Sequence, residues 1–374
     1  MKIGILTLPL RTNYGGILQA YALQMSLRDM GHEVYIIEKK RKPLYLPIWK
    51  APAVYGKRLI KNVLGTPVPI FYEQKKNREN NIGLPIIRQN TDKFIEKYIN
   101  RYIVDDFSAI REKDFDSIIV GSDQIWRPKY FPEIQHAFLD FTGNWGIKRI
   151  AYAASFGTDE WEYSLKQTKS CSNLLKKFDA VSVREDSGVT LCSEHLGVEA
   201  RHLLDPTMLL DTADYMDLCS AAGVAHSPGT LLCYILDESP EKMALIEKMA
   251  VEKGLVPFRV NSKVENRQAP LEERIQPPVE QWLRGFYDAE FVITDSFHAC
   301  VFSILFNKPF IAIGNKDRGM SRFTSLLKMF DLQDRLISLD MKNNIKDNID
   351  WVQVNSILTS KRLLSRQFLE NSLI

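Results

Sequence analysis

The chain has 374 residues, of which 45% are hydrophobic and 25% are charged, the ordinary proportions of a globular protein. At roughly 100–200 residues per domain, this length favours two domains. The 49 basic and 46 acidic residues leave a formal net charge of +3. Because nucleic-acid binders carry a strong basic excess, we expect no nucleic-acid partner.

The cysteines show neither C-x-x-C spacing nor a nearby pair of histidines, so they predict no zinc site and no disulfide framework. No apolar stretch approaches the roughly 20 residues that a membrane-spanning helix needs. We expect a cytoplasmic protein without metal or cofactor, in at most peripheral contact with the inner face of the membrane. Nothing in the sequence indicates an oligomeric state.

The first part of the chain alternates between short apolar runs and stretches with helical spacing. Strands predicted at 2–7 and 33–38 flank a helix that opens at Gly15-Gly16 and stops at Gly31. This order is the signature of a parallel sheet with crossover helices. Further strands are predicted at 117–120, 148–156 and 180–183.

Residues 40–70 break this pattern with five prolines, and with aromatic side chains among basic ones. We interpret them as an irregular insertion. They form either a surface loop that packs its aromatic side chains on the domain, or a lid or membrane-touching segment near an acceptor site. Residues 71–112 are expected to be mostly helical.

A second alternating series begins near residue 231, and an amphipathic helix closes the chain. Two such halves predict an α/β protein with two Rossmann-like domains that face a central cleft. The expected parts are an N-terminal domain at 1–206, a C-terminal domain at 207–350 and a C-terminal helix at 351–374.

The strongest local signal is Thr294-Asp295-Ser296-Phe297-His298-Ala299, where a buried strand turns into a helix. Ligands of open α/β sheets bind at the carboxyl ends of strands, and the start of a helix attracts anions. Asp295 or Ser296 can cap this helix. His298 in its first turn can act as an acid or base. On placement alone, a capping triplet with a histidine bonded to a neighbouring carbonyl explains the motif equally well.

Cations follow strands in both domains. Lys316, Arg318 and Arg322 come after the strand predicted at 309–313, and Arg184 comes after the strand at 180–183. A planar guanidinium suits a carboxylate or phosphate, so these groups predict a pocket for a small anion. A solvated basic loop, and an ion pair of Arg184 with a neighbouring carboxylate, are the alternatives.

Two loops that contain glycine follow strands of the first domain. Asn13-Tyr14-Gly15-Gly16 brings a ligand close to the backbone, although it is not a G-x-G-x-x-G fingerprint. Gly121-Ser122-Asp123-Gln124-Ile125-Trp126 supplies an acid, an amide and an aromatic ring, which suit hydrogen bonds to sugar hydroxyls and stacking on a sugar. For each loop, a tight turn required by the fold is the alternative.

With Tyr152–Gly157, Val183–Ser187 and Asp205–Thr207, these motifs make the chain resemble the polysaccharide pyruvyltransferase family over most of its length. The resemblance implies a GT-B-like arrangement with the active site between the domains. It also implies that phosphoenolpyruvate donates a carboxyethylidene group to two hydroxyls of one sugar, forming a ketal and releasing phosphate. The expected partners are phosphoenolpyruvate, on the C-terminal domain, and a sugar or lipid-linked glycan acceptor, on the N-terminal domain.

By motif position, the resemblance implies His298 as the catalytic residue and Arg184, Ser296 and Lys316 as donor-binding residues. The expected acceptor-binding or cleft residues are Asn13, Tyr14, Gly15, Gly16, Asp123 and Gln124. Many family members have an arginine where this chain has Ser296, so either Arg184 and Lys316 carry more of the donor's charge or the donor differs. A GT-B glycosyltransferase that uses a nucleotide sugar, and a non-catalytic sugar- or anion-binding protein, are the other functions considered.

Overall fold

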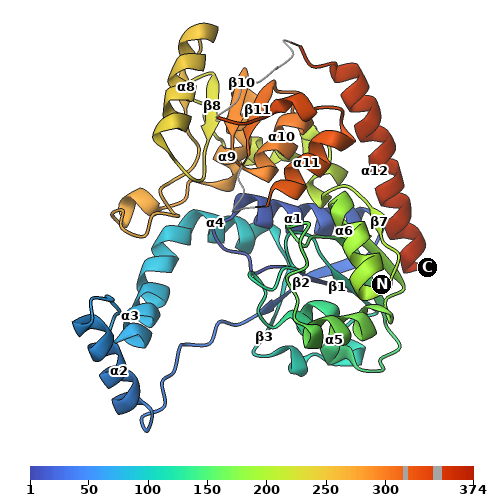
Figure 1. Ribbon diagram of the computed structural model, residues 1–374. Helices are drawn as coiled ribbons and strands as arrows, with labels where there is room; N and C mark the ends of the chain where they lie inside the picture. Colours follow the sequence, from blue (N-terminus) through green and yellow to red (C-terminus); the bar gives the residue numbers. More distant parts are fainter. Residues whose placement is uncertain (315–318, 340–347) are drawn as a thin grey trace.

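The computed structural model describes residues 1–314, 319–339 and 348–374, which form two α/β domains (Figure 1). The N-terminal domain contains a seven-stranded sheet in the order β3-β2-β1-β4-β5-β6-β7. The C-terminal domain contains a five-stranded sheet in the order β12-β11-β10-β8-β9. Neighbouring strands pair in parallel in both sheets.

The strands are short apolar runs, and the central ones are buried along their whole length, as expected when helices cover both faces of a parallel sheet. In the first sheet they are β1 (Lys2–Leu6), β2 (Glu33–Lys39), β3 (Arg101–Val104), β4 (Ser117–Val120), β5 (Lys148–Ala154), β6 (Ala180–Val183) and β7 (Arg201–His202). In the second sheet they are β8 (Leu231–Tyr234), β9 (Pro257–Phe258), β10 (Phe291–Thr294), β11 (Phe310–Ile313) and β12 (Leu336–Ile337).

Helices connect the strands and cover the sheets. In the N-terminal half they are α1 (Tyr14–Asp29), α2 (Ala51–Val63), α3 (Tyr72–Arg78), α4 (Leu84–Tyr98), α5 (Leu165–Leu175) and α6 (Asp186–Leu191). In the C-terminal half they are α7 (Thr212–Ala221), α8 (Pro240–Lys253), α9 (Val279–Asp288), α10 (Phe297–Leu305), α11 (Met320–Met329) and α12 (Trp351–Leu373). None of the helices within the described ranges is long and apolar enough to cross a membrane.

Each sheet has a point where the chain reverses the direction in which it adds strands. In the first sheet β2 and β4 lie on opposite sides of β1, and in the second sheet β9 and β10 lie on opposite sides of β8. Loops at such points diverge and leave a crevice at the carboxyl ends of the strands. The loops after β1, β4, β8 and β10 are therefore placed to form a ligand site between the domains.

Helix α1 lies between the two domains (Figure 1). It is buried on nearly every face, which identifies a helix enclosed by protein rather than a surface helix. Its apolar residues belong to one continuous cluster with α9 and α10 of the second domain. The two domains thus share a core, and the cleft between them opens at the start of α1.

One prediction for residues 40–112 is wrong in part. Residues 40–70 are not irregular throughout, because α2 occupies Ala51–Val63 with Pro52 in its first turn, where a missing N–H costs no hydrogen bond. The expectation that residues 71–112 are mostly helical is confirmed, since helical structure runs from Tyr72 to Tyr98. The β-branched and aromatic residues of Arg101–Val104 then form strand β3 at the edge of the sheet, beside β2.

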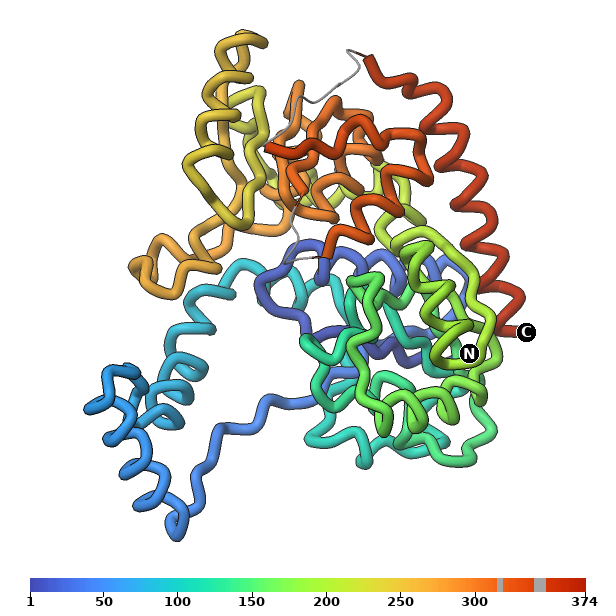
Figure 2. The backbone as a smooth tube through the Cα atoms, viewed as in Figure 1, coloured from blue at the N-terminus to red at the C-terminus, as the bar shows by residue number. Residues whose placement is uncertain are grey.

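Helix α12 leaves the second domain and runs back along the first (Figure 2). The Ser365 hydroxyl accepts a hydrogen bond from the Leu204 backbone N–H at 3.3 Å. Arg362 and Arg366 donate to the backbone carbonyls of Met208 and Leu209, at 2.7 and 2.9 Å. The last helix therefore holds the segment that joins the two domains through hydrogen bonds to its backbone.

The packing of α12 predicts that substitutions of two of its leucines differ in their effect on stability. Leu369 is fully buried, whereas Leu363 is 58% exposed. Leu369→Ala is expected to lower the free energy of unfolding by about 2–5 kcal/mol, because it leaves a cavity in a packed core. Leu363→Ala should change it by less than about 0.5 kcal/mol. Urea denaturation of both variants measures the contrast, and equal losses would contradict this account of α12.

Candidate active site

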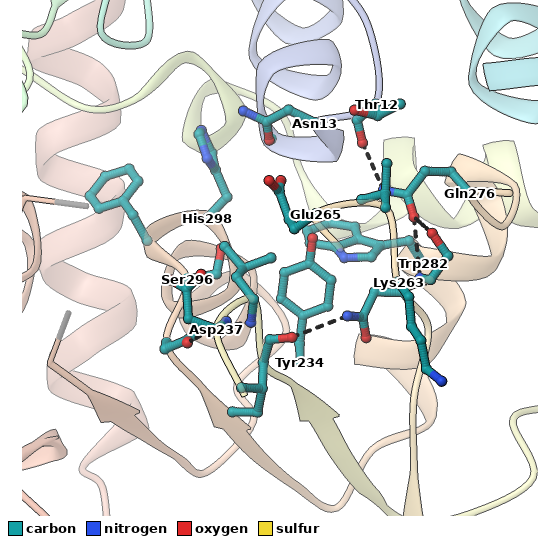
Figure 3. A pocket seen from close by; sticks show the side chains of 18 of the residues that line it. Thr12, Asn13, Tyr234, Asp237, Lys263, Glu265, Gln276, Trp282, Ser296 and His298 are labelled. Carbon is teal, nitrogen blue, oxygen red and sulfur yellow. Dashed lines mark hydrogen bonds between the residues drawn. The ribbon is translucent and has the colours of Figure 1, made fainter. Parts of the chain in front are cut away.

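A cavity of about 1220 Å³ lies between the domains, at the carboxyl ends of both sheets. The first domain contributes the loops after β1 and β4, including Thr12, Asn13, Gly15, Asp123 and Gln124. The second domain contributes the segments that follow β8, β9 and β10. Figure 3 shows side chains of both groups pointing into the same space.

His298 stands at the first turn of α10 and lines this cavity. Its imidazole is nearly buried, at 6% exposure, and lies directly against Gly15 at the start of α1. A Cβ atom at Gly15 would come within 2.0 Å of the His298 Nδ1 atom. The glycine of the Asn13–Gly16 loop is therefore required because a histidine from the other domain occupies the space of its side chain.

Asp205 is the carboxylate that faces His298. Its Oδ2 atom lies 3.5 Å from His298 Nε2 and accepts a hydrogen bond from Arg184 at 2.7 Å. Its Oδ1 atom accepts hydrogen bonds from the backbone N–H and the hydroxyl of Thr207, at 3.0 and 2.7 Å. Within the described part of the chain, His298 Nε2 has no closer polar partner. The carboxylate is thus held rigidly beside the imidazole.

Arg184 links Asp205 to a second carboxylate. It donates to Asp123 Oδ1 at 3.1 Å, and the three side chains are at most 4% exposed. Two carboxylates and one guanidinium leave one negative charge in excess. A buried excess charge needs a partner, and the nearby guanidinium of Arg322, which lowers the pKa of Asp123, supplies one.

The pKa values of the carboxylates reflect this arrangement. Burial alone would raise the pKa of Asp205, but His298 and Arg184 outweigh it and hold the pKa well below its ordinary value. Burial also opposes ionisation of Asp123, yet Arg184, His298 and Arg322 lower its pKa. Both carboxylates are therefore ionised at neutral pH.

Arg322 provides a second cation at the cavity. It lines the cavity although only 7% of its surface is exposed. Burial, followed by repulsion from Arg184, lowers its pKa to about 10. The guanidinium carbons of Arg184 and Arg322 lie 4.5 and 5.4 Å from the centre of the Phe297 ring. An anion that bound at Arg322 would relieve the repulsion between the two arginines.

The structure separates the expected donor-binding residues. Ser296 lines the cavity. Arg184 does not line it, because its guanidinium is enclosed by Asp123 and Asp205. Its ion-pair partners are therefore these two carboxylates and not its sequence neighbours Glu185 and Asp186. Lys316 and Arg318 lie outside the described residues. Of the expected cations that the structure describes, Arg322 is the one that lines the cavity. Direct contact between Arg184 and a donor stays a prediction.

Some of the expected acceptor residues line the cavity and others do not. Asn13, Gly15, Asp123 and Gln124 line the cavity, whereas Tyr14 and Gly16 do not. Tyr14 is fully buried, and its hydroxyl donates to the Pro277 carbonyl of the second domain at 2.8 Å. It therefore helps to hold the domains together.

Two details of the expected site are wrong. Neither Asp295 nor Ser296 caps α10 through its side chain. The Asp295 carboxylate instead accepts hydrogen bonds from the backbone of Leu236 and Asp237 and from Lys242, and so shapes the loop after β8. The Trp126 ring offers no surface for sugar stacking, because it is fully buried and packs on Phe138 at 5.0 Å.

Residues that organise the loops were missed from the sequence. Gln19 donates to the hydroxyl of Thr7 and accepts from the backbone N–H of Ser122, each at 2.9 Å, and so fixes the loop after β4. Gln276 of the second domain donates to the Thr12 carbonyl of the first at 2.8 Å (Figure 3). A lone buried glutamine carries no sequence signal, because its partners come from other elements.

Among the described residues, no group of three or more His, Cys, Asp or Glu side chains could hold a metal ion. All five cysteines are buried and lie outside any disulfide. The buried histidine, the carboxylate that orients it and the cations beside the cavity are therefore the groups available for acid–base chemistry on an anionic ligand.

The architecture matches solved GT-B glycosyltransferases. UGT89C1 of Arabidopsis thaliana in complex with UDP-L-rhamnose gives a TM-score of 0.50 at 9% identity, covering 100% of this chain and 99% of that one. The chain therefore has the predicted α/β fold, with two Rossmann-like domains in the GT-B arrangement.

Two more distant structures are similar over the whole chain. The N-terminal domain of Candida albicans trehalose-6-phosphate phosphatase gives a TM-score of 0.44 at 14% identity, covering 100% of this chain and 96% of that one. UDP-GlcNAc 2-epimerase of Neisseria meningitidis bound to UDP-GlcNAc gives 0.44 at 10% identity, covering 97% and 100%. No curated protein matches the chain in sequence.

The sequence model of the polysaccharide pyruvyl transferase family matches residues 13–317. This range begins at the first residue of the Asn13–Gly16 loop and includes His298, Asp205, Arg184 and Asp123. The chain belongs to the polysaccharide pyruvyl transferase family, which confirms the resemblance, and it is a member of a transferase family.

Removing the charge of Asp205 is expected to destabilise the protein. Asp205→Asn leaves Arg184 with one carboxylate and should cost about 3 kcal/mol or more at neutral pH. The pKa of Asp205 is lowered on folding, so its contribution to stability is complete above the ordinary value of 3.8 and is lost progressively as the pH falls from there through the lower pKa of the folded protein. Chemical denaturation at pH 7 and pH 3 measures this difference.

The loss of stability caused by Asp205→Asn should therefore be larger at pH 7 than at pH 3. Exposed Asp159→Asn is the matched control and should leave stability unchanged at both values. A penalty for Asp205→Asn that did not depend on pH would contradict the assignment of its charge.

The contact between Gly15 and His298 predicts a local effect. Gly15→Ala should displace the imidazole and shift its ring resonances in a histidine-selective NMR spectrum, because the new methyl group would occupy the same space. Gly56→Ala is the control, since a Cβ there meets no atom within 4 Å. Unchanged His298 resonances in Gly15→Ala would refute the contact.

Proposed function

We propose that this protein transfers a pyruvyl group, as a carboxyethylidene ketal, from phosphoenolpyruvate to two hydroxyls of a sugar in a surface polysaccharide or its precursor. The single observation that carries the proposal is the buried His298–Asp205 pair at the edge of a cavity that also presents Arg322. Family membership supports the same reaction class.

The donor is an anion with a phosphate and a carboxylate. Arg322 and the first turn of α10, where no side chain caps the backbone N–H groups, suit one of these groups. Ser296 at the start of α10 offers a hydroxyl but no charge. In this proposal Arg322, rather than an arginine at position 296, neutralises the donor, while Arg184 acts through Asp205.

His298 manages the protons of the reaction. A protonated imidazole gives a proton to the methylene carbon of phosphoenolpyruvate. The first sugar hydroxyl adds to the neighbouring carbon, and its own proton passes to the imidazole and restores the imidazolium. The second hydroxyl then displaces phosphate, which carries away the remaining proton. Asp205 stabilises the imidazolium throughout, as a buried carboxylate does for a catalytic histidine.

The acceptor would lie on the side of the first domain. Asn13, Gln124 and Asp123 are among the polar residues of this domain that line the cavity. Tyr130 lines the same wall with 39% of its surface exposed and offers an aromatic face to a sugar ring.

The test begins with donor binding. Calorimetry should show that the protein binds phosphoenolpyruvate, and that Arg322→Gln weakens binding roughly 10–100-fold through the loss of a charged hydrogen bond. Exposed Lys248→Gln is the control and should bind normally. Binding of UDP-sugars but not of phosphoenolpyruvate would instead identify a nucleotide-sugar glycosyltransferase.

Transfer is then measured with isotopically labelled phosphoenolpyruvate and glycans from cells that lack the gene. We expect labelled, acid-labile glycan and released phosphate with the wild type. His298→Ala should bind the donor but reduce transfer about 10²–10⁴-fold or more. Donor binding without transfer to any of these glycans would indicate a binding protein, and full activity of His298→Ala would refute the proposed role.

A further inference from the structure

Residues 40–83 form a helical arm that stands away from the body of the N-terminal domain (Figures 1 and 2). The arm consists of an extended segment, helix α2, a turn and helix α3. None of the residues of α2 is buried. The arm therefore adds nothing to the core, and its surface must be explained in another way.

The outer face of α2 is apolar. Leu59, Ile60, Val63 and Leu64 are 49–85% exposed, and their spacing places them on one side of the helix. The segment before α2 adds Tyr45, Ile48 and Trp49 with 77–82% exposure. Seven exposed apolar or aromatic side chains within residues 45–64 are more than scattered surface positions explain and indicate an interaction site.

The polar contacts of the arm lie on the opposite side of α2 and hold it in shape. Arg58 donates two hydrogen bonds to the Glu73 carboxylate, at 2.8 and 2.7 Å. The Asn62 amide exchanges two hydrogen bonds with the backbone of Val68, at 2.9 and 2.5 Å. The fold of the arm thus turns polar groups inward and presents the apolar side chains to the outside.

The part of the arm that carries these exposed apolar residues is basic. Residues 40–72 contain seven basic side chains and no acidic one, whereas the whole chain has a net charge of only +3. The basic residues are Lys40, Arg41, Lys42, Lys50, Lys57, Arg58 and Lys61. At the base of the arm, Arg41, Lys42 and Arg88 also line a cavity of about 260 Å³.

We infer that the arm docks the protein on the surface of an anionic lipid bilayer. Apolar residues would enter the boundary between headgroups and acyl chains, with Trp49 and Tyr45 at the level of the headgroups. Lysines beside them would neutralise lipid phosphates. Because two copies of residues 40–72 would place seven basic side chains against seven with no acidic one between them, charge favours the bilayer over self-association.

This inference does not depend on the reaction of the cavity. One partner accounts for both the exposed apolar side chains and the absence of acidic residues from residues 40–72. Of the interpretations left open for residues 40–70, membrane contact is the one that we propose.

The test is co-sedimentation of the full chain with vesicles. We expect binding to phosphatidylcholine vesicles that contain phosphatidylglycerol, weaker binding to phosphatidylcholine alone, and release by high salt. The double variant Ile60→Ser/Val63→Ser should lower the partition coefficient about tenfold or more. Lys57→Gln/Lys61→Gln should weaken binding to the anionic vesicles alone.

The matched control is Val251→Ser/Val352→Ser, whose two valines are equally exposed, at 83%, on α8 and α12. This control should bind vesicles as the wild type does. Light scattering after gel filtration provides the opposing outcome: a wild-type dimer that Ile60→Ser/Val63→Ser converts to monomer would show that a second copy covers the arm. Failure of the wild type to bind anionic vesicles at low salt would also overturn the inference.

Discussion

The buried pairing of Arg184 with Asp205 and Asp123 is the interaction on which the site depends. It joins the ends of β4 and β6 to the segment that leads into the second domain, in a place with almost no contact with water. Charges in such a place are tolerated only when each has a partner at close range. This pairing therefore fixes how the two strand ends meet the linking segment, and it places the Asp205 carboxylate beside the imidazole of His298.

The two domains meet through contacts that position this histidine. The hydroxyl of Tyr14 reaches the backbone of the second domain, and the amide of Gln276 reaches back to the first. On the far side, the Ser325 hydroxyl accepts a hydrogen bond from the Asp186 N–H at 2.9 Å. With a shared core around α1, these bonds make the cleft a defined cavity.

Much of the fold followed from the sequence, because parallel strands are continuous apolar runs and crossover helices carry their own stop signals, such as Gly31. The positions of Asn13, Gly15, Asp123, Gln124, Ser296 and His298 at the cavity also followed, because the ends of parallel strands meet at one edge. The sequence could not reveal that Arg184 is enclosed by two carboxylates, since Asp123 and Asp205 are remote along the chain. For the same reason Asp205 went unrecognised as the partner of His298. Trp126 was mistaken for a binding surface because the loop pattern does not show that Phe138 and Phe156 cover its ring. The strand β3 was missed because it lies at the edge of the sheet, where only its last residue is buried.

The contact between His298 and Gly15 makes the site depend on both domains. The histidine belongs to the second domain, whereas the glycine and two of the charged side chains, Asp123 and Arg184, belong to the first. A separation of the domains by a few ångström would part His298 from the backbone and the charges that prepare it. The set of groups around the imidazole is thus complete only while the two domains are together as they are in this structure.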